Sequence, residues 1–150
     1  MARRAKAAPE VDEARRAKYE ELYDEEVLRP MDFFPHDCNA SDDPKLQRLR
    51  DEHGWEAMGR WWRIVEAMSA AQGHYLDVSR EAQWARLAAT LELEGADRAR
   101  EFVGWLAECG LVDREALGNN HVMSARVIRN AEYVARRVAS RRLGAWVTNR

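Results

Sequence analysis

The segment from residue 55 to residue 71 constrains the fold of this chain more than any other. At about 100° per residue along an α-helix, its apolar side chains sweep roughly half of the circumference. Glu56, Arg60 and Arg63 occupy the opposite side. A helix with so wide an apolar face must bury it against several neighbours, so we expect it at the centre of a helical core. The apolar residues are Trp55, Met58, Trp61, Trp62, Ile64, Val65 and Met68.

At 150 residues and 17.3 kDa, the chain has the length of one domain. Its 46% hydrophobic residues and six tryptophans supply enough apolar surface for a sizeable core. The two cysteines, Cys38 and Cys109, form no CxxC motif, which argues against a disulfide framework and a structural zinc site. No apolar run approaches the ~18 residues of a membrane span, and the N-terminus lacks the apolar core of a signal peptide. We therefore expect a cytoplasmic protein.

Capping and helix-breaking residues divide the rest of the chain into further helices. Asp43-Pro44 is a strong helix start, because aspartate accepts from free N–H groups and proline fits the first turn. Gly54 separates the short helix that follows from the central one, and Gly110 fits the left-handed position after a helix end. Ser124 can cap the last helix. Besides residues 55–71, we expect helices over residues 10–28, 44–53, 80–91, 96–109 and 124–144.

Short apolar stretches before and after the expected helices at residues 80–91 and 96–109 predict a small sheet. Residues 111–113 and 121–123 flank a seven-residue loop that ends in Gly-Asn-Asn, a turn-forming sequence, so we expect a β-hairpin. Residues 73–78 add a turn and a short strand before the helix pair. Helix, strand, two helices, hairpin and helix in this order is the winged-helix arrangement. We therefore predict a mainly α fold with a small β-hairpin, a winged-helix-like domain with helical N- and C-terminal extensions.

These patterns divide the chain into three parts. Residues 1–31 combine a basic, alanine-rich tail, expected to be disordered over its first nine residues, with an acidic helical extension. Residues 32–123 form the winged-helix-like domain, and residues 124–150 form a basic C-terminal helix.

An ordered set of short motifs runs from residue 32 to about residue 130. The motifs are Phe33-Phe34-Pro35-His36-Asp37, Asp43-Pro44-Lys45, Gly54-Trp55, Gly59 with Trp61-Trp62, Val65-Glu66, Gly73-His74-Tyr75, Cys109-Gly110-Leu111 and Val122-Met123-Ser124. This set resembles the N-terminal domain of phage-type replisome organisers, a family first catalogued as a domain of unknown function in listerial prophages. The resemblance implies a winged-helix-like module of DNA replication and not an enzyme. It also implies a place at the start of replisome-organiser proteins, whose later parts help to recruit the helicase machinery.

The two ends of the chain carry opposite charge, which the overall net charge of −2 conceals. Residues 10–28 hold eight acids and three bases, a net charge of −5. Residues 124–150 hold seven arginines and one acid, Glu132, a net charge of +6. Such asymmetry indicates either an interaction surface or two ends that pair with each other.

The last helix carries the strongest indication of nucleic-acid binding. An apolar seam with an arginine face opposite suits a helix that docks on the domain while it contacts a phosphate backbone. The alternatives are a solvated basic face and pairing with the acidic N-terminal segment, within one chain or between chains. The seam consists of Val127, Ala131, Val134 and Val138, and the opposite face of Arg126, Arg129, Tyr133, Arg136, Arg137 and Ser140.

A second candidate lies on the helix at residues 96–109, which would be the recognition helix of a winged helix. Arg98 and Arg100 on its outer side are able to read guanine edges. However, Glu101 and Glu108 on the same side would repel phosphates. The alternative is a helix that supports packing or a protein contact, and Trp105 fits either a protein interface or burial under a terminal helix.

The sequence offers little to catalysis or to metal binding. His36-Asp37-Cys38 is the one candidate for a metal site or a catalytic nucleophile. However, the spacing of the other histidines does not suit metal ligands, and no zinc motif is present. We expect this entry segment to be structural, with Phe33 and Phe34 anchored on the core. There is no P-loop, dinucleotide fingerprint or serine elbow, so we predict no enzyme, no cofactor and no metal.

Together, these observations predict the DNA-binding domain of a phage-type or prophage-type replication-initiation protein. Its arginine-rich C-terminal helix would contact DNA phosphates through Arg126, Arg129, Arg136 and Arg137, with Tyr133 beside them and Arg98 and Arg100 secondary. The alternative is a protein-interaction or oligomerisation module without direct DNA binding. The expected partners are DNA, a second copy of the chain or replication proteins, without a membrane.

Overall fold

A computed structural model describes residues 9–150, so the predicted disorder of the basic tail lies mostly outside the described residues. The described chain is mainly helical and contains a small antiparallel sheet of two strands. The predicted fold class is thereby confirmed in its mainly helical character and its small two-stranded antiparallel β element. The elements are α1 (Pro9–Val27), η1 (Ala40–Asp42), α2 (Pro44–Ser69), η2 (Gln72–His74), β1 (Leu76–Asp77), α3 (Glu81–Thr90), α4 (Ala96–Glu108), α5 (Arg114–Gly118), β2 (His121–Val122) and α6 (Ala125–Thr148).

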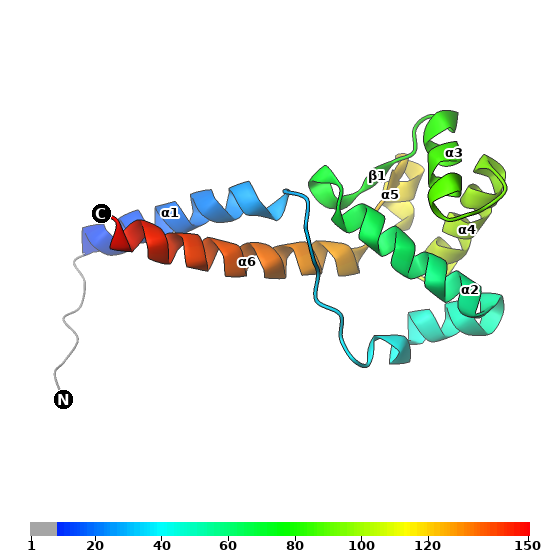
Figure 1. The fold of residues 1–150 in the computed structure, drawn as a ribbon, viewed down its shortest axis with the longest axis horizontal. Helices are drawn as coiled ribbons and strands as arrows, with labels where there is room; N and C mark the ends of the chain where they lie inside the picture. The colour runs from blue at the N-terminus through cyan, green and yellow to red at the C-terminus, as the bar shows by residue number, and fades with distance from the viewer. Residues whose placement is uncertain (1–8) are drawn as a thin grey trace.

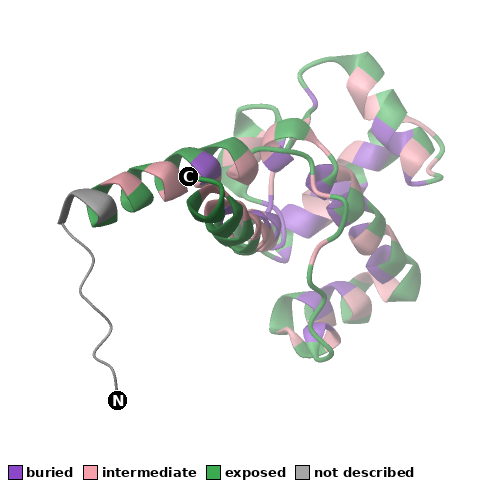
Figure 2. Ribbon diagram, turned by 60° about the vertical axis from the view of Figure 1, so that its left-hand side comes forward, coloured by how far each residue is buried: buried purple, intermediate pink, exposed green. Residues whose placement is uncertain are grey.

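The molecule consists of a body and an arm. Helices α2 to α5 and the sheet form the body, whereas α1 and α6 run side by side in opposite directions and project from it (Figure 1). Buried residues gather in the body, and most of the arm's surface is exposed (Figure 2). No helix in the described part of the chain is both long and apolar enough to cross a membrane.

Helix α2 is the central element, as its apolar face predicts. The Asp43 carboxylate accepts from the Lys45 backbone N–H at 2.9 Å and caps its first turn. Gly54, at φ 83° and ψ −179°, interrupts the helix where the sequence predicts a break, in a region that favours glycine. Trp61 is fully buried, but Trp55 is 69% exposed and lies under the Arg50 guanidinium, so its predicted place in the core is wrong. The body core comprises Leu46, Leu49, Trp61, Ile64, Val65, Met68, Phe102, Val103, Leu106, Val122 and Val127, among others.

The sheet forms, but not from the predicted hairpin. Strand β2 pairs with β1, with Leu76 opposite Val122, and residues 114–118 are helix α5. The backbone N–H groups of Leu111 and Val112 both donate to the Leu106 carbonyl, at 2.9 and 3.3 Å, so they close the end of α4 instead of joining a ladder. Asp113 accepts from the Ala116 N–H at 2.7 Å and caps α5. One bond from Asp113 N–H to the Met123 carbonyl, at 2.9 Å, is what connects the two expected strands.

The order of helix, strand, two helices, one short helix, strand and helix is nevertheless consistent with a winged helix. Gly110, at φ 80°, ends α4 as predicted, because a residue in this left-handed conformation closes a helix C-terminus. The two helices α3 and α4 pack against each other between the two strands in sequence.

Helix α6 begins as predicted and continues to Thr148, about one turn beyond the expected end. Ser124 is the residue before its first turn, but its side chain makes no capping hydrogen bond. The predicted seam is correct at Val127 and Ala131, which are buried. It is wrong at its second half, because Ala135 and Ala139 are the buried residues there. Small side chains on this row let α1 approach α6 closely, and Val134 and Val138 on the neighbouring row remain half-buried.

Candidate nucleic-acid interface

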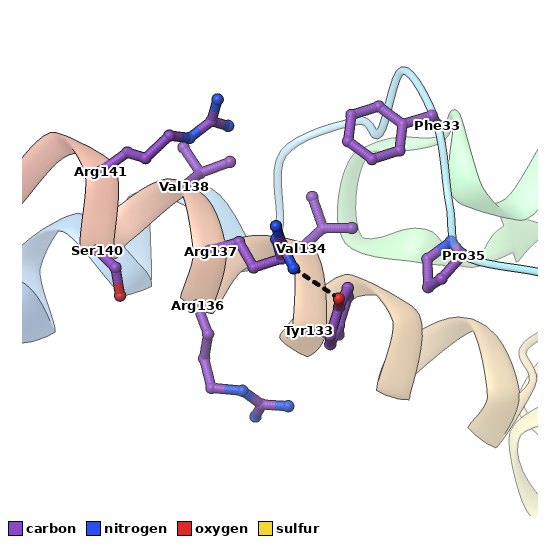
Figure 3. Close-up of a pocket in the computed structure, with 9 residues that line it drawn as sticks. All are labelled: Phe33, Pro35, Tyr133, Val134, Arg136, Arg137, Val138, Ser140 and Arg141. Atoms are coloured by element: carbon purple, nitrogen blue, oxygen red, sulfur yellow. Dashed lines mark hydrogen bonds between the residues drawn. The ribbon is translucent and has the colours of Figure 1, made fainter.

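A groove of about 690 Å³ lies between the extended segment after α1 and the middle of α6 (Figure 3). Val134 and Val138, left open by α1, form its floor. Two exposed aromatic rings belong to its wall, Phe33 at 68% and Tyr133 at 43% exposure. The predicted anchoring of Phe33 on the core is therefore wrong, whereas Phe34 does pack against the core. The groove is lined by Phe33, Pro35, Tyr133, Val134, Arg136, Arg137, Val138, Ser140 and Arg141.

The arginines of this groove have few acidic partners. Arg137 donates to the Tyr133 hydroxyl at 2.9 Å, and its guanidinium stands 5.6 Å from the centre of that ring. Arg136 approaches Glu132 at 3.9 Å only, and its side chain remains 55% exposed. Neither Arg137 nor Arg141 has an ion pair with any acid among the described residues. Exposed cations of this kind keep their charge available to a polyanion.

Helix α1 packs along α6 and brings Tyr23 and two acidic side chains close to charged residues of α6. Burial raises the pKa of Tyr23 on α1, the nearby Glu132 raises it further, and Arg136 opposes the change. Tyr23 therefore lies beside these two residues of α6. Farther along, Arg142 donates to Glu25 at 2.9 Å and to Glu26 at 2.8 Å. The hydrogen bonds to these carboxylates raise the pKa of Arg142 above its usual value.

The opposite charges of the two ends thus meet within one chain, but at Arg142 and not at the predicted binding residues. This arrangement satisfies two of the acids of α1 without neutralising the groove. The pair with Glu25 is exposed and contributes at most about 1 kcal/mol, whereas the Glu26 side chain is largely buried. The buried Leu22 on α1 supplies the apolar contact that holds the arm together.

Arg126 has a structural position at the start of α6. Its side chain is 19% exposed and donates to the Asp43 carboxylate at 3.0 Å. The guanidinium also stands 5.8 Å from the centre of the Trp62 ring. These contacts join the first turn of α6 to the cap of α2, so Arg126 is not free in the way that Arg137 is. Arg129, one turn later, is exposed and has no ion pair among the described residues.

The arginines of α4 are neutralised by neighbouring acids. Arg98 pairs with Glu101 at 3.2 Å, and Arg100 pairs with Asp97 at 2.7 Å and with Glu81 of α3. The hydrogen bond that Arg100 donates to the Glu81 carboxylate is the main cause of the raised pKa of Arg100. With Asp97, Arg98, Arg100, Glu101 and Glu108, the helix carries a net charge of −1.

Trp105 on α4 stacks on His53 of α2, with ring centroids 3.8 Å apart and planes 6° apart. Its partner within the chain is therefore the first half of α2 and not a terminal helix, and the ring remains partly buried. His36 lies against Trp62, with ring centroids 4.2 Å apart and planes tilted by 36°. Among the described residues, no group of three histidine, cysteine or acidic side chains is close enough to hold a metal ion.

The groove brings together some of the predicted site residues and adds others. Tyr133, Arg136 and Arg137 line it, whereas Arg126, Arg129, Arg98 and Arg100 lie elsewhere. Sequence reasoning missed Arg141 at this site, although its position four residues after Arg137 places both on one helix face. It also missed Phe33, for which no pattern in the sequence indicates an exposed ring.

The chain matches the family model described as Lin1244/Lin1753-like, N-terminal, over residues 33–128. The match begins at Phe33 in the groove and ends in the first turn of α6, so α1 and most of α6 lie outside it. No curated protein and no solved structure matched the chain. Since the matched residues make up more than half of the 150 residues, this chain belongs to the Lin1244/Lin1753-like N-terminal domain family.

Proposed function

We propose that this chain is a nucleic-acid-binding domain of a phage-type replication-initiation protein, and that it contacts phosphates through the arginine face of α6. One observation carries this proposal: Arg137 and Arg141 have no acidic partner among the described residues and stand beside the loosely paired Arg136. Phosphate contacts supply most of the sequence-independent affinity for nucleic acids. The family membership and the motif set that resembles replisome organisers support the replication context.

The winged-helix element order also supports a DNA-binding domain, but it places the contact differently from the usual arrangement. In a helix-turn-helix domain the second helix of the pair enters the major groove. Here that helix is α4, whose arginines pair with acids and whose net charge is −1. We therefore assign the main contact to α6 and a secondary role to Arg98 and Arg100.

Charge reversal on α6 tests this assignment. In the triple variant Arg136→Glu, Arg137→Glu, Arg141→Glu, affinity for DNA of every sequence should fall, as measured by fluorescence anisotropy of labelled oligonucleotides. The matched control is Arg98→Glu, Arg100→Glu on α4, which should bind nearly as well as the original chain. The opposite ranking of the two variants would move the contact to α4.

The second candidate function is a protein-interaction module that binds no DNA. The half-buried floor of Val134 and Val138 beside the exposed ring of Phe33 favours it, because apolar surface of this kind also fits a protein partner. Light scattering separates the two. A monomer at tens of micromolar that binds DNA would remove this candidate, and a stable oligomer indifferent to DNA would favour it.

A further inference from the structure

The geometry points to single-stranded nucleic acid, and not duplex, as the ligand of the groove on α6. The inference rests on the proposed function and specifies its substrate class. Phe33 and Tyr133 would stack on unpaired bases, while Arg136, Arg137 and Arg141 would follow the backbone. Non-specific single-strand sites combine these two elements, aromatic platforms and a cationic groove.

The aromatic rings are presented from two different elements. Tyr133 belongs to α6, and Phe33 belongs to the extended segment that crosses beside it (Figure 3). Phe33 is 68% exposed although its neighbour Phe34 packs against the core. Isolated exposed apolar side chains are common on proteins and carry no meaning alone. Here, however, the ring shares one groove with a second exposed ring and an apolar floor.

The cations surround this apolar strip instead of forming a separate patch. Arg137 is held against Tyr133 by the hydrogen bond of 2.9 Å and by its position over the ring. Arg136 and Arg141 extend from opposite sides of α6 in the view of Figure 3. A strand whose bases lie on the apolar strip would therefore meet guanidinium groups along its phosphates. The floor of Val134 and Val138 would be covered in the same step.

A duplex does not fit these features equally well. In B-form DNA the base faces are stacked inside the helix, and the grooves offer base edges and phosphates. Phe33 and Tyr133 would gain no stacking from such a surface. In addition, α1 packs along α6, so α6 is not a free rod that enters a major groove. Unpaired bases alone supply the flat apolar faces that match the exposed rings.

Comparison of three labelled ligands tests the inference on the full chain. One is oligo(dT) of about 12 nucleotides, within the usual range for a single-strand site, and the second is an abasic strand of the same length and charge. A duplex of equal length is the third ligand. We expect tight anisotropy binding to oligo(dT) and weaker binding to both the abasic strand and the duplex.

Two ring deletions and their conservative counterparts identify the stacking residues. Phe33→Ala and Tyr133→Ala should each lower affinity for oligo(dT) by about fivefold or more, with little change for the abasic strand. Phe33→Trp and Tyr133→Phe keep a ring and should retain binding. Trp55→Ala removes another exposed ring, outside the groove, and should have no effect. Because both groove rings are exposed, the circular dichroism of these variants should match that of the original chain.

Failure of this inference alone can be distinguished from failure of the proposed function. If arginine reversal abolishes binding but the ring deletions change nothing, or if duplex binds as well as oligo(dT), the single-strand inference is wrong and the proposed function stands. If no nucleic acid binds at all, both are wrong. Binding of an acidic peptide in preference to oligo(dT) would assign the groove to a protein partner and overturn both as well.

Discussion

Replacing Arg137 by alanine should reduce the salt dependence of binding as well as the affinity. Counterion release makes the logarithm of the binding constant fall with the logarithm of salt concentration, with a slope of about −0.7 for each phosphate neutralised on a single strand. Three groove arginines, each on one phosphate, give a slope of about −2. Affinity should then fall by roughly 20-fold between about 50 and about 200 mM salt.

With Arg137→Ala, two arginines remain, so the slope should become about −1.4 and the loss over the same salt range roughly sevenfold. Anisotropy titrations of labelled oligo(dT) at four or five salt concentrations measure both slopes. The matched control is Arg126→Ala, because Arg126 is 19% exposed and bonded to Asp43. It should lower stability but leave the slope unchanged. An unchanged slope in Arg137→Ala, or a changed one in Arg126→Ala, would refute this count of phosphate contacts.

Three further predictions concern stability and reactivity. Gly54→Ala should destabilise the fold by about 1–3 kcal/mol in urea unfolding, because φ 83° and ψ −179° suit glycine alone. Gly59→Ala is the control: it lies at a helical position with open space around a Cβ and should be neutral or stabilising. Equal changes in unfolding free energy in the two variants would contradict the special backbone conformation at Gly54. Leu22→Ala removes the buried side chain of α1, so amide hydrogen exchange should become faster in α1 and not in α2. Unchanged protection of the α1 amides would show that Leu22 does not hold α1 in place. Cys38 is exposed and should react quickly with a thiol reagent. Cys109 should react only on unfolding, because burial raises its pKa and keeps the thiol protonated. Equal reaction rates of the two cysteines in the native protein would contradict the burial of Cys109.

The longer helices of this fold were predictable because their ends are set by local chemistry, whereas the short α5 was not. Asp43-Pro44 starts α2 and Gly54 divides it, and both depend on residues adjacent in sequence. Gly110 ends α4 for the same reason. The central position of α2 also follows from its own apolar face.

What could not be predicted depends on contacts between distant residues. On α6, the row of Ala135 and Ala139 and the row of Val134 and Val138 are both apolar, and only the position of α1 decides which row is buried. Strand pairing is similar, because β2 had two possible partners and the N–H groups of residues 111 and 112 were already used by α4.

The candidate site shows the same limit. The sequence indicates that α6 is basic, but Arg126 meets an aspartate 83 residues away. Helical spacing does not distinguish it from Arg137, which meets a tyrosine one turn away and remains without an acid among the described residues. The free charge of a helix face is therefore a property of the tertiary structure.

Photochemical cross-linking tests most directly whether nucleic acid lies in the groove on α6. A photoreactive oligonucleotide would be irradiated with the full chain, and the adducts would be located by peptide mass spectrometry. We expect adducts at Tyr133 or Phe33, and we expect them to be lost in the charge-reversed variant of Arg136, Arg137 and Arg141. Adducts confined to α4, or adducts at α6 that survive the charge reversal, would contradict it.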